Sequence, residues 1–264
     1  MKKLALALAA TAAFAGQAIA ADMPMKARPM AQPVAVYNWT GCNINGGGGY
    51  GWYDIESRQV DPVTGAFVAR QGDGGGRGWM GQVGAGCDYQ FAGPWGNWVV
   101  GLTGDYTFSD VKGDHLGAPN TSWVGQLKED WSWAVGGRIG YLVNPTFLTY
   151  FGAGYTETHF KGSAYTNYIT GLPSAAPLPF GLNSQQYQGW YLSSGFEYGL
   201  NFLSPGLFLK TEYRYSEFGE KRVNVVNTAG TIVSAENIKP FTQSVITSLV
   251  WRFNWGKTPV VAKY

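Results

Sequence analysis

Residues 130–143, DWSWAVGGRIGYLV, alternate between two kinds of side chain. From Trp131 onward the odd-numbered positions are mostly large and apolar, whereas the even-numbered positions are Ser132, Ala134, Gly136, Arg138 and Gly140. A repeat of two residues places successive side chains on opposite faces of a β-strand. The stretch therefore predicts one long strand with a large apolar face and a small polar face.

The same alternation recurs along the chain, and eight stretches of 12 to 15 residues can be read as strands. These lengths exceed the roughly 5–6 residues of a soluble strand and suffice for the roughly 9–11 that cross a bilayer. One of the eight, 147–160, alternates poorly, so its two faces cannot be assigned from sequence. The clearest of the others are GWMGQVGAGCDYQF (78–91), WVVGLTGDYTF (98–108), GWYLSSGFEYGL (189–200), GLFLKTEYRYSEF (206–218) and SVITSLVWRFNW (244–255).

Three observations predict that the apolar face points outward into lipid. Large rings occur on nearly every strand, and together they exceed the volume that the lumen of a small barrel can hold. The aromatic residues also cluster near strand ends, as they do in the girdles of membrane barrels. The opposite face is dominated by Gly, Ser and Thr with isolated charges of both signs, which suits a narrow polar interior. With the apolar face in lipid the polar face must point inward, because a lipid-facing Arg138 would cost about 2–4 kcal/mol at the bilayer midplane. The alternative is a soluble, lipocalin-like barrel that buries its aromatic face.

The connections between the stretches alternate strictly in length. Long segments at 54–76, 110–128, 161–186 and 219–240 are separated by short turns at 93–96, 144–145 and 204–206. Outer-membrane barrels have this asymmetry, with short periplasmic turns and long extracellular loops. The sequence thus predicts an all-β fold, an eight-stranded antiparallel transmembrane β-barrel with both termini in the periplasm.

The N-terminus predicts export. Residues 1–20, MKKLALALAATAAFAGQAIA, have the basic start, apolar run and small-residue cleavage site of a signal peptide. We expect a Pro-rich periplasmic linker at 21–37, the barrel at 38–255 and a periplasmic tail at 256–264. Removing the leader leaves 17 basic and 17 acidic residues, a balance that argues against a nucleic-acid partner.

The polar face of the predicted strands carries charges of both signs. Because unpaired buried charges are expensive, we expect these side chains to form a paired, hydrogen-bonded plug inside the barrel. The alternative is a selectivity filter that lines a narrow channel. The predicted interior residues are Asp88, Asp105, Arg138, Glu197, Lys210, Glu212, Arg214 and Arg252.

Little in the sequence indicates an enzyme. The chain has two histidines, His115 and His159, and neither has the spacing of a catalytic triad, so both are interpreted as solvated loop residues. The stretch QGDGGGRGW (71–79) lacks the Lys-Ser/Thr of a phosphate-binding loop, and no Cys/His set has zinc spacing. We therefore predict no catalytic residue, no metal and no cofactor. Capture of a small ligand such as haem, with His115 or His159 as ligand, is a minor alternative.

The two cysteines predict a disulfide. Export places them in an oxidising compartment, where disulfides persist. In an antiparallel hairpin whose first strand ends near Tyr53 and whose second begins near Arg77, Cys42 and Cys87 come to lie opposite each other on the outward face. A Cys42–Cys87 bond would hold the register of this hairpin. The alternative is two free thiols that behave as small apolar residues.

Six stretches in order carry a family resemblance: WTGCNINGGGGYGW (39–52), GQVGAGCDYQF (81–91), WVVGLTGDYTF (98–108), GRIGYL (137–142), GWYLSSGFEYGL (189–200) and LKTEYRYSEFG (209–219). They resemble the small outer-membrane β-barrel family of alphaproteobacteria, whose members are described as outer membrane immunogenic protein or porin family protein and are related to the OmpA-type barrel. Two departures are Cys42, where such proteins commonly have an aromatic residue, and the chain beyond Phe253.

The resemblance implies the outer membrane of a Gram-negative cell. Because the predicted interior is a plug and the long loops are rich in Gly, Asn, Thr and Pro, we expect a structural, surface-exposed protein that supports envelope integrity and surface interactions. The implied partners are outer-membrane lipid, lipopolysaccharide, the barrel assembly machinery, and host or surface ligands bound by the loops. A narrow porin-like channel is the main alternative.

Overall fold

The computed structural model describes residues 38–70, 74–116, 123–169 and 172–253, and the regular structure of these residues is entirely β-strand. A single antiparallel sheet of 12 strands contains all of it. None of the described residues belongs to a helix long and apolar enough to cross a membrane. The strands are β1 (Gly41–Val60), β2 (Phe67–Arg70), β3 (Gly74–Gly93), β4 (Gly96–Leu116), β5 (Trp123–Asn144), β6 (Phe147–Lys161), β7 (Ser163–Ile169), β8 (Leu172–Leu182), β9 (Gln185–Gly199), β10 (Leu207–Phe218), β11 (Lys221–Asn227) and β12 (Ile232–Phe253).

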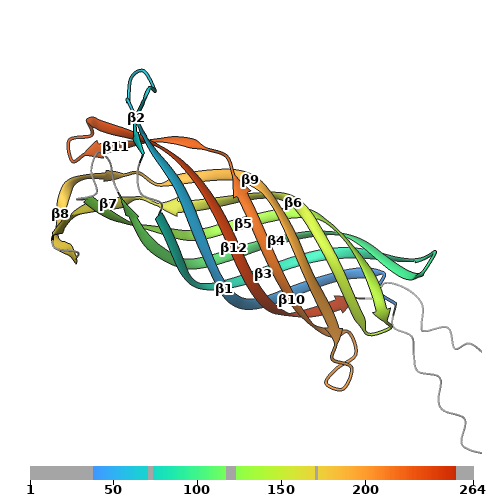
Figure 1. The fold of residues 1–264 in the computed structure, drawn as a ribbon. Coiled ribbons are helices and arrows are strands. Elements are labelled where there is room, and N and C mark those ends of the chain that lie inside the picture. The colour runs from blue at the N-terminus through green and yellow to red at the C-terminus, as the bar shows by residue number, and fades with distance from the viewer. Residues whose placement is uncertain (1–37, 71–73, 117–122, 170–171, 254–264) are drawn as a thin grey trace, which may run out of the picture. The chain divides into compact units, whose positions relative to one another are not determined.

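The sheet closes on itself into a barrel (Figure 1). Pairing runs through β1, β3, β4, β5, β6, β9, β10 and β12, and a long β1–β12 ladder from Cys42↔Phe253 to Val60↔Ala235 completes the ring. We call the end where β1 begins and β12 finishes the terminal end. The other end, which carries β2, β7, β8 and β11, is the extended end.

The prediction of an all-β antiparallel barrel is confirmed, whereas the predicted count of eight strands is not. The difference arises in the four segments that were expected to be irregular long loops. There β1, β4, β5 and β12 continue well past the predicted strand ends, and β2, β7, β8 and β11 form additional short strands.

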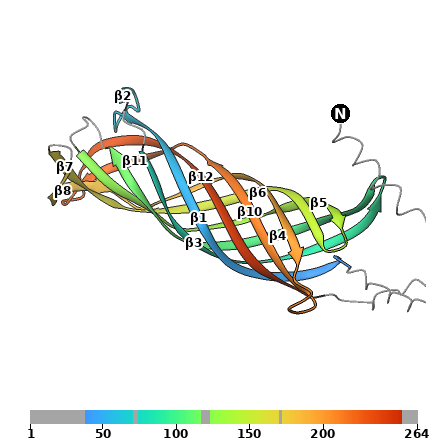
Figure 2. The ribbon, with the colours of Figure 1, turned by 60° about the horizontal axis from the view of Figure 1, so that its bottom comes forward.

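The short strands β7, β8 and β11 extend the barrel wall at the extended end (Figure 2). There β5 pairs with β7, β7 with β8, β8 with β11 and β11 with β12. These four pairings carry the sheet from β5 to β12 beyond the points where β6, β9 and β10 begin or end. The barrel wall therefore continues past the ends of three of its strands.

The described side chains follow the predicted faces. Leu102 and Trp79 are each 73% exposed on the outside, whereas Arg138 is buried inside. A belt of exposed apolar residues on a water-soluble surface would be costly, and it suits a lipid surface. On β6, whose faces the sequence left unassigned, Leu148, Tyr150 and Phe160 point inward and Phe151 points outward.

Candidate functional site

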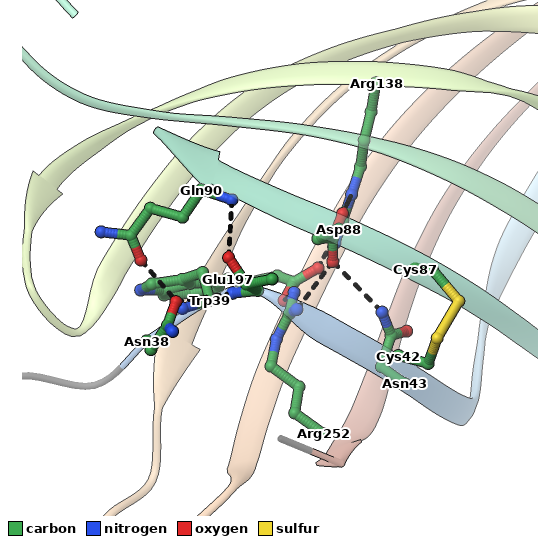
Figure 3. A network of polar contacts seen from close by, with 11 residues as sticks. Asn38, Trp39, Cys42, Asn43, Cys87, Asp88, Gln90, Arg138, Glu197 and Arg252 are labelled. Carbon is green, nitrogen blue, oxygen red and sulfur yellow. Dashed lines mark hydrogen bonds and ion pairs between the residues drawn. A yellow bond between two sulfur atoms is a disulfide. The ribbon is translucent and has the colours of Figure 1, made fainter. Parts of the chain in front are cut away.

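Two arginines and two carboxylates meet inside the barrel near its terminal end (Figure 3). Arg138 donates to both oxygens of Asp88, with Nε–Oδ1 and Nη2–Oδ2 distances of 2.9 and 2.6 Å, and its Nη1 lies 2.5 Å from Glu197 Oε1. Arg252 completes the ring, because its Nη1 lies 2.7 Å from Asp88 Oδ2 and its Nη2 lies 2.5 Å from Glu197 Oε2. All four residues are buried, and Asn43 donates a further bond to Asp88. We call these four residues the Asp88 cluster.

Aromatic and aliphatic side chains close the lumen on the terminal side of the Asp88 cluster. Trp39 is fully buried, its backbone N–H donates to Gln90, and its indole N–H donates to the Pro145 carbonyl at 3.1 Å. The guanidinium carbon of Arg252 lies 4.6 Å from the Trp39 ring centre and 5.3 Å from that of Phe208. Further buried residues at this level are Val99, Leu142, Leu148 and Val250.

A second group of charges lies further toward the extended end. Arg214 forms a two-pronged pair with Asp105, with Nη1–Oδ1 and Nη2–Oδ2 distances of 2.8 and 2.7 Å, and its Nη2 also lies 2.8 Å from Glu212 Oε1. The Tyr150 hydroxyl donates to Glu212 Oε2 at 2.8 Å. The Arg214 guanidinium packs on the ring of Tyr191, 4.5 Å from its centre. We call Asp105, Tyr150, Glu212 and Arg214 the Arg214 cluster.

The two clusters are joined into one interior network. The Arg138 guanidinium lies 5.0 Å from the ring centre of Tyr150, and Lys210 is buried with Glu197 as its neighbour across the β9–β10 ladder. The structure thus brings all eight charged residues predicted for the interior into the lumen. Four are cationic and four anionic, so their formal charges cancel. Sequence reasoning missed Trp39 and Tyr150, the first because it precedes β1 and the second because the faces of 147–160 were unassigned.

The space between the charged groups is small. The cavity bounded by both clusters, with Asn45 and Ser193 on its walls, measures about 10 Å³. A second cavity of about 20 Å³ lies between Arg214 and Glu129. A cavity needs about 10–15 Å³ to hold one water molecule, so these spaces fit isolated waters and not a continuous file.

The interior of the extended end is apolar, which corrects the expectation of a polar lumen throughout. Tyr53, Phe160 and Tyr187 pack edge to face, with ring centres 5.2 and 5.8 Å apart. At this end the wall lies beyond the lipid-facing apolar belt. Burial of apolar side chains in its interior therefore stabilises it, as in the core of a water-soluble domain. Alternating valines in KRVNVVN (221–227) were the available signal within a predicted loop. This apolar cap consists of Tyr53, Ile55, Met80, Val111, Leu127, Phe160, Tyr165, Leu182, Tyr187, Phe218, Val223, Val225 and Ile238.

Three hydrogen-bonded polar side chains, those of His115, Tyr165 and Glu236, lie together within the extended end. Glu236 accepts from the Tyr165 hydroxyl at 2.9 Å, and its other oxygen lies 2.8 Å from His115 Nε2. Burial, followed by the charge of Glu236, raises the pKa of Tyr165 well above its ordinary value, so the phenol stays protonated and donates. His115 is therefore a buried structural residue, which corrects its interpretation as a solvated histidine.

His159 is half-buried, stacked on Trp131 with ring centres 5.3 Å apart, and its Nδ1 lies 2.5 Å from Asp130. Both histidines therefore have a carboxylate partner. In the part of the chain that the structure describes, no group of three or more His, Cys, Asp or Glu side chains is placed to hold a metal ion.

The predicted disulfide is present. Cys42 and Cys87 are joined, and they are direct partners in the β1–β3 ladder. The bond lies on the outward face, one residue from both Asn43 and Asp88 of the interior network. It therefore fixes the register of the two strands that supply Asn43 and Asp88.

Comparison with known proteins points to one family. A family model described as an outer membrane protein beta-barrel domain matches residues 4–253. The 25 kDa outer-membrane immunogenic protein of Brucella abortus is 25% identical over 231 residues, which cover 86% of this chain and 90% of the relative. Among solved structures, OprG from Pseudomonas aeruginosa is 15% identical with a TM-score of 0.46, covering 82% of this chain and 98% of that one. Neisserial surface protein A is 14% identical with a TM-score of 0.40, covering 81% and 98%.

Proposed function

Because the chain belongs to the family of outer-membrane β-barrel domain proteins, we propose that it is a closed structural barrel that strengthens the outer membrane and presents its extended end to the outside. In this proposal the short turns of the terminal end face the periplasm. Cys42 and Phe253, which pair at that end, then lie where an exported chain would leave its termini.

The observation that carries the proposal is the Asp88 cluster. Its two arginines each bridge the same two carboxylates, so no member is left without an opposite charge. Removing one member of such a buried pair costs several kcal/mol, and the cluster therefore favours one tight arrangement of β3, β5, β9 and β12. A network of this kind stabilises a wall and blocks a lumen at the same time.

The narrow channel is the competing function. A water-filled path needs a continuous polar lumen, but the interior cavities measure about 10 and 20 Å³. The apolar cap and the fully buried Trp39 lie on either side of the charged network. These features support the closed barrel over the channel.

Two sets of exposed residues suit the partners that we propose for this function. Val63, Phe67 and Val68 are exposed on and beside the β2 hairpin of the extended end, where a surface ligand or host molecule could contact them. Leu249, Trp251 and Phe253 alternate outward on the last strand. We propose this final strand as the segment that the assembly machinery reads.

Deletion of the gene in its native cell tests the proposal through two separate readouts. We expect increased leakage of periplasmic protein and increased sensitivity to detergent, because a wall-stabilising protein is lost. Uptake of a small hydrophilic solute, such as a chromogenic β-lactam, should stay unchanged. Complementation with the wild-type gene should restore integrity. Slower solute uptake in an intact envelope would instead identify a porin.

A further inference from the structure

Four cationic side chains form a row across four neighbouring strands. Arg77 on β3 is the direct ladder partner of Lys112 on β4, Lys112 is that of Lys128 on β5, and Lys128 is that of Lys161 on β6. We call these four residues the cation row. With strands about 4.8 Å apart, the row extends over roughly 14 Å of the barrel circumference.

The cation row faces outward, just beyond the aromatic belt. Val111, Leu127 and Phe160, each adjacent in sequence to a lysine of the row, are buried in the apolar cap, so the lysines point the other way. Trp79 lies two residues from Arg77 on the same face and is 73% exposed. Tryptophan rings mark the membrane–water boundary of a barrel, which puts the cation row at the level of lipid head groups.

Nearby carboxylates neutralise the cation row only in part. Asp110 lies 3.0 Å from Lys112 Nζ and 2.5 Å from that of Lys128, and Asp130 lies 3.7 Å from Lys161 Nζ while it also contacts His159. Within the described ranges Arg77 has no ion-pair partner. Asp54 and Asp114 lie two residues beyond the row along β1 and β4, toward the extended end. Among the described residues no ion pair joins either of them to the row.

Such an arrangement is unfavourable by itself, because like charges directly opposite each other on neighbouring strands destabilise a sheet. On the opposite wall, three ion pairs or cross-strand pairs join a cation to a carboxylate. There Glu56 pairs across the ladder with Lys239, Lys239 Nζ lies 2.6 Å from Glu217, and Arg58 pairs with Glu220. Arg58 also faces Arg70 across the β1–β2 ladder, so that wall has one cation–cation pair, whereas the β3–β6 wall aligns four cations in succession.

We propose that the cation row binds the phosphate groups of lipopolysaccharide in the surrounding outer leaflet. This inference rests on the proposed function, because it needs the extended end to face outward. Phosphate oxygens accept several charge-assisted hydrogen bonds, and they would supply the negative charge that the row lacks. A row roughly 14 Å long is wider than a single phosphate group and suits a glycolipid that carries more than one.

Native mass spectrometry of barrels released from phosphatidylcholine nanodiscs doped with lipopolysaccharide tests the proposal. Wild-type protein should retain the glycolipid, and it should retain a dephosphorylated form at least tenfold less. The variant R77Q/K112Q/K128Q/K161Q should retain the phosphorylated form at least tenfold less than wild type. The control R58Q/K221Q/R222Q/K239Q removes the same charge from the extended end outside the row and should bind as wild type does.

Three outcomes would overturn the proposal: equal retention of the dephosphorylated lipid by wild type, equal loss in the two variants, or complete displacement by inorganic phosphate at the lipid concentration. The wild-type comparison of the two lipids holds even where a variant fails to fold. Failure of the proposed function would give a different result. A protein that is not a membrane barrel would fail to enter nanodiscs even in the absence of lipopolysaccharide.

Discussion

Asp88 accepts hydrogen bonds from three side chains, and the room for its carboxylate comes from a glycine on the next strand. Gly101 is the ladder partner of Asp88 on β3 and of Arg138 on β5. A Cβ placed on Gly101 would lie 2.0 Å from Asp88 Oδ1. The glycine of the inward face is therefore what allows a large ion pair to fit in a narrow lumen.

Replacement of Arg138 by Gln should lower the free energy of unfolding by about 3 kcal/mol, because Asp88 and Glu197 would each lose a buried partner. Urea unfolding of the barrel in phospholipid vesicles, followed by tryptophan fluorescence, measures this change. The double variant Arg138→Gln with Glu197→Gln should lose less than the two single losses combined, since the partners interact directly.

The control for this prediction is Arg58→Gln, which removes an exposed ion pair with Glu220 and should stay within about 1 kcal/mol of wild type. If Arg138→Gln and Arg58→Gln were equally mild, the Asp88 cluster would not stabilise the barrel.

For single strands, the alternation in the sequence predicted the two faces best where one face is entirely lipid-facing. Residues 130–143 alternate cleanly because their outward side meets lipid and their inward side meets a narrow polar lumen. The β6 stretch lacks this contrast, since Leu148 and Phe160 face the two apolar ends of the lumen while Phe151 faces outward. Apolar residues on both faces erase the alternation.

The strands of the extended end were missed for a different reason. β8 contains Pro173, Pro177 and Pro179, which argue against a strand because proline cannot donate to a ladder. The β7–β8 pairing accommodates them through register shifts near Thr166. The strand is held by its position between β7 and β11, which is a tertiary constraint and has no local signal.

Phe160→Ala should loosen the extended end and leave the rest of the barrel folded. Phe160 is buried between Tyr53 and Tyr187, so its replacement leaves a cavity in the apolar cap. This cavity should lower the stability of the cap by about 3–5 kcal/mol. Hydrogen–deuterium exchange should accelerate in β7, β8 and β11 but not near the Asp88 cluster. Phe151→Ala, on the outward face of the same strand, is the matched control and should leave exchange in β7 and β8 unchanged. Uniform acceleration throughout the barrel would contradict a separate apolar cap.

Across the whole barrel, the interior changes from apolar to charged and back to apolar between the terminal end and the extended end. The aromatic and aliphatic base around Trp39 is followed by the Asp88 cluster, the Arg214 cluster and finally the apolar cap. Burial of apolar side chains stabilises the two ends, and paired charges fill the middle, where only small groups and their partners fit. Each layer leaves little room for a water path.

Recording from purified barrels in planar bilayers tests the closed lumen most directly. We expect no large steady conductance, because a passing ion would have to separate the paired charges of the Asp88 cluster in a lumen whose cavities have room only for single waters. A wide, water-filled barrel recorded in the same bilayers provides the positive control. Stable wild-type channels of high conductance would show that the lumen is open.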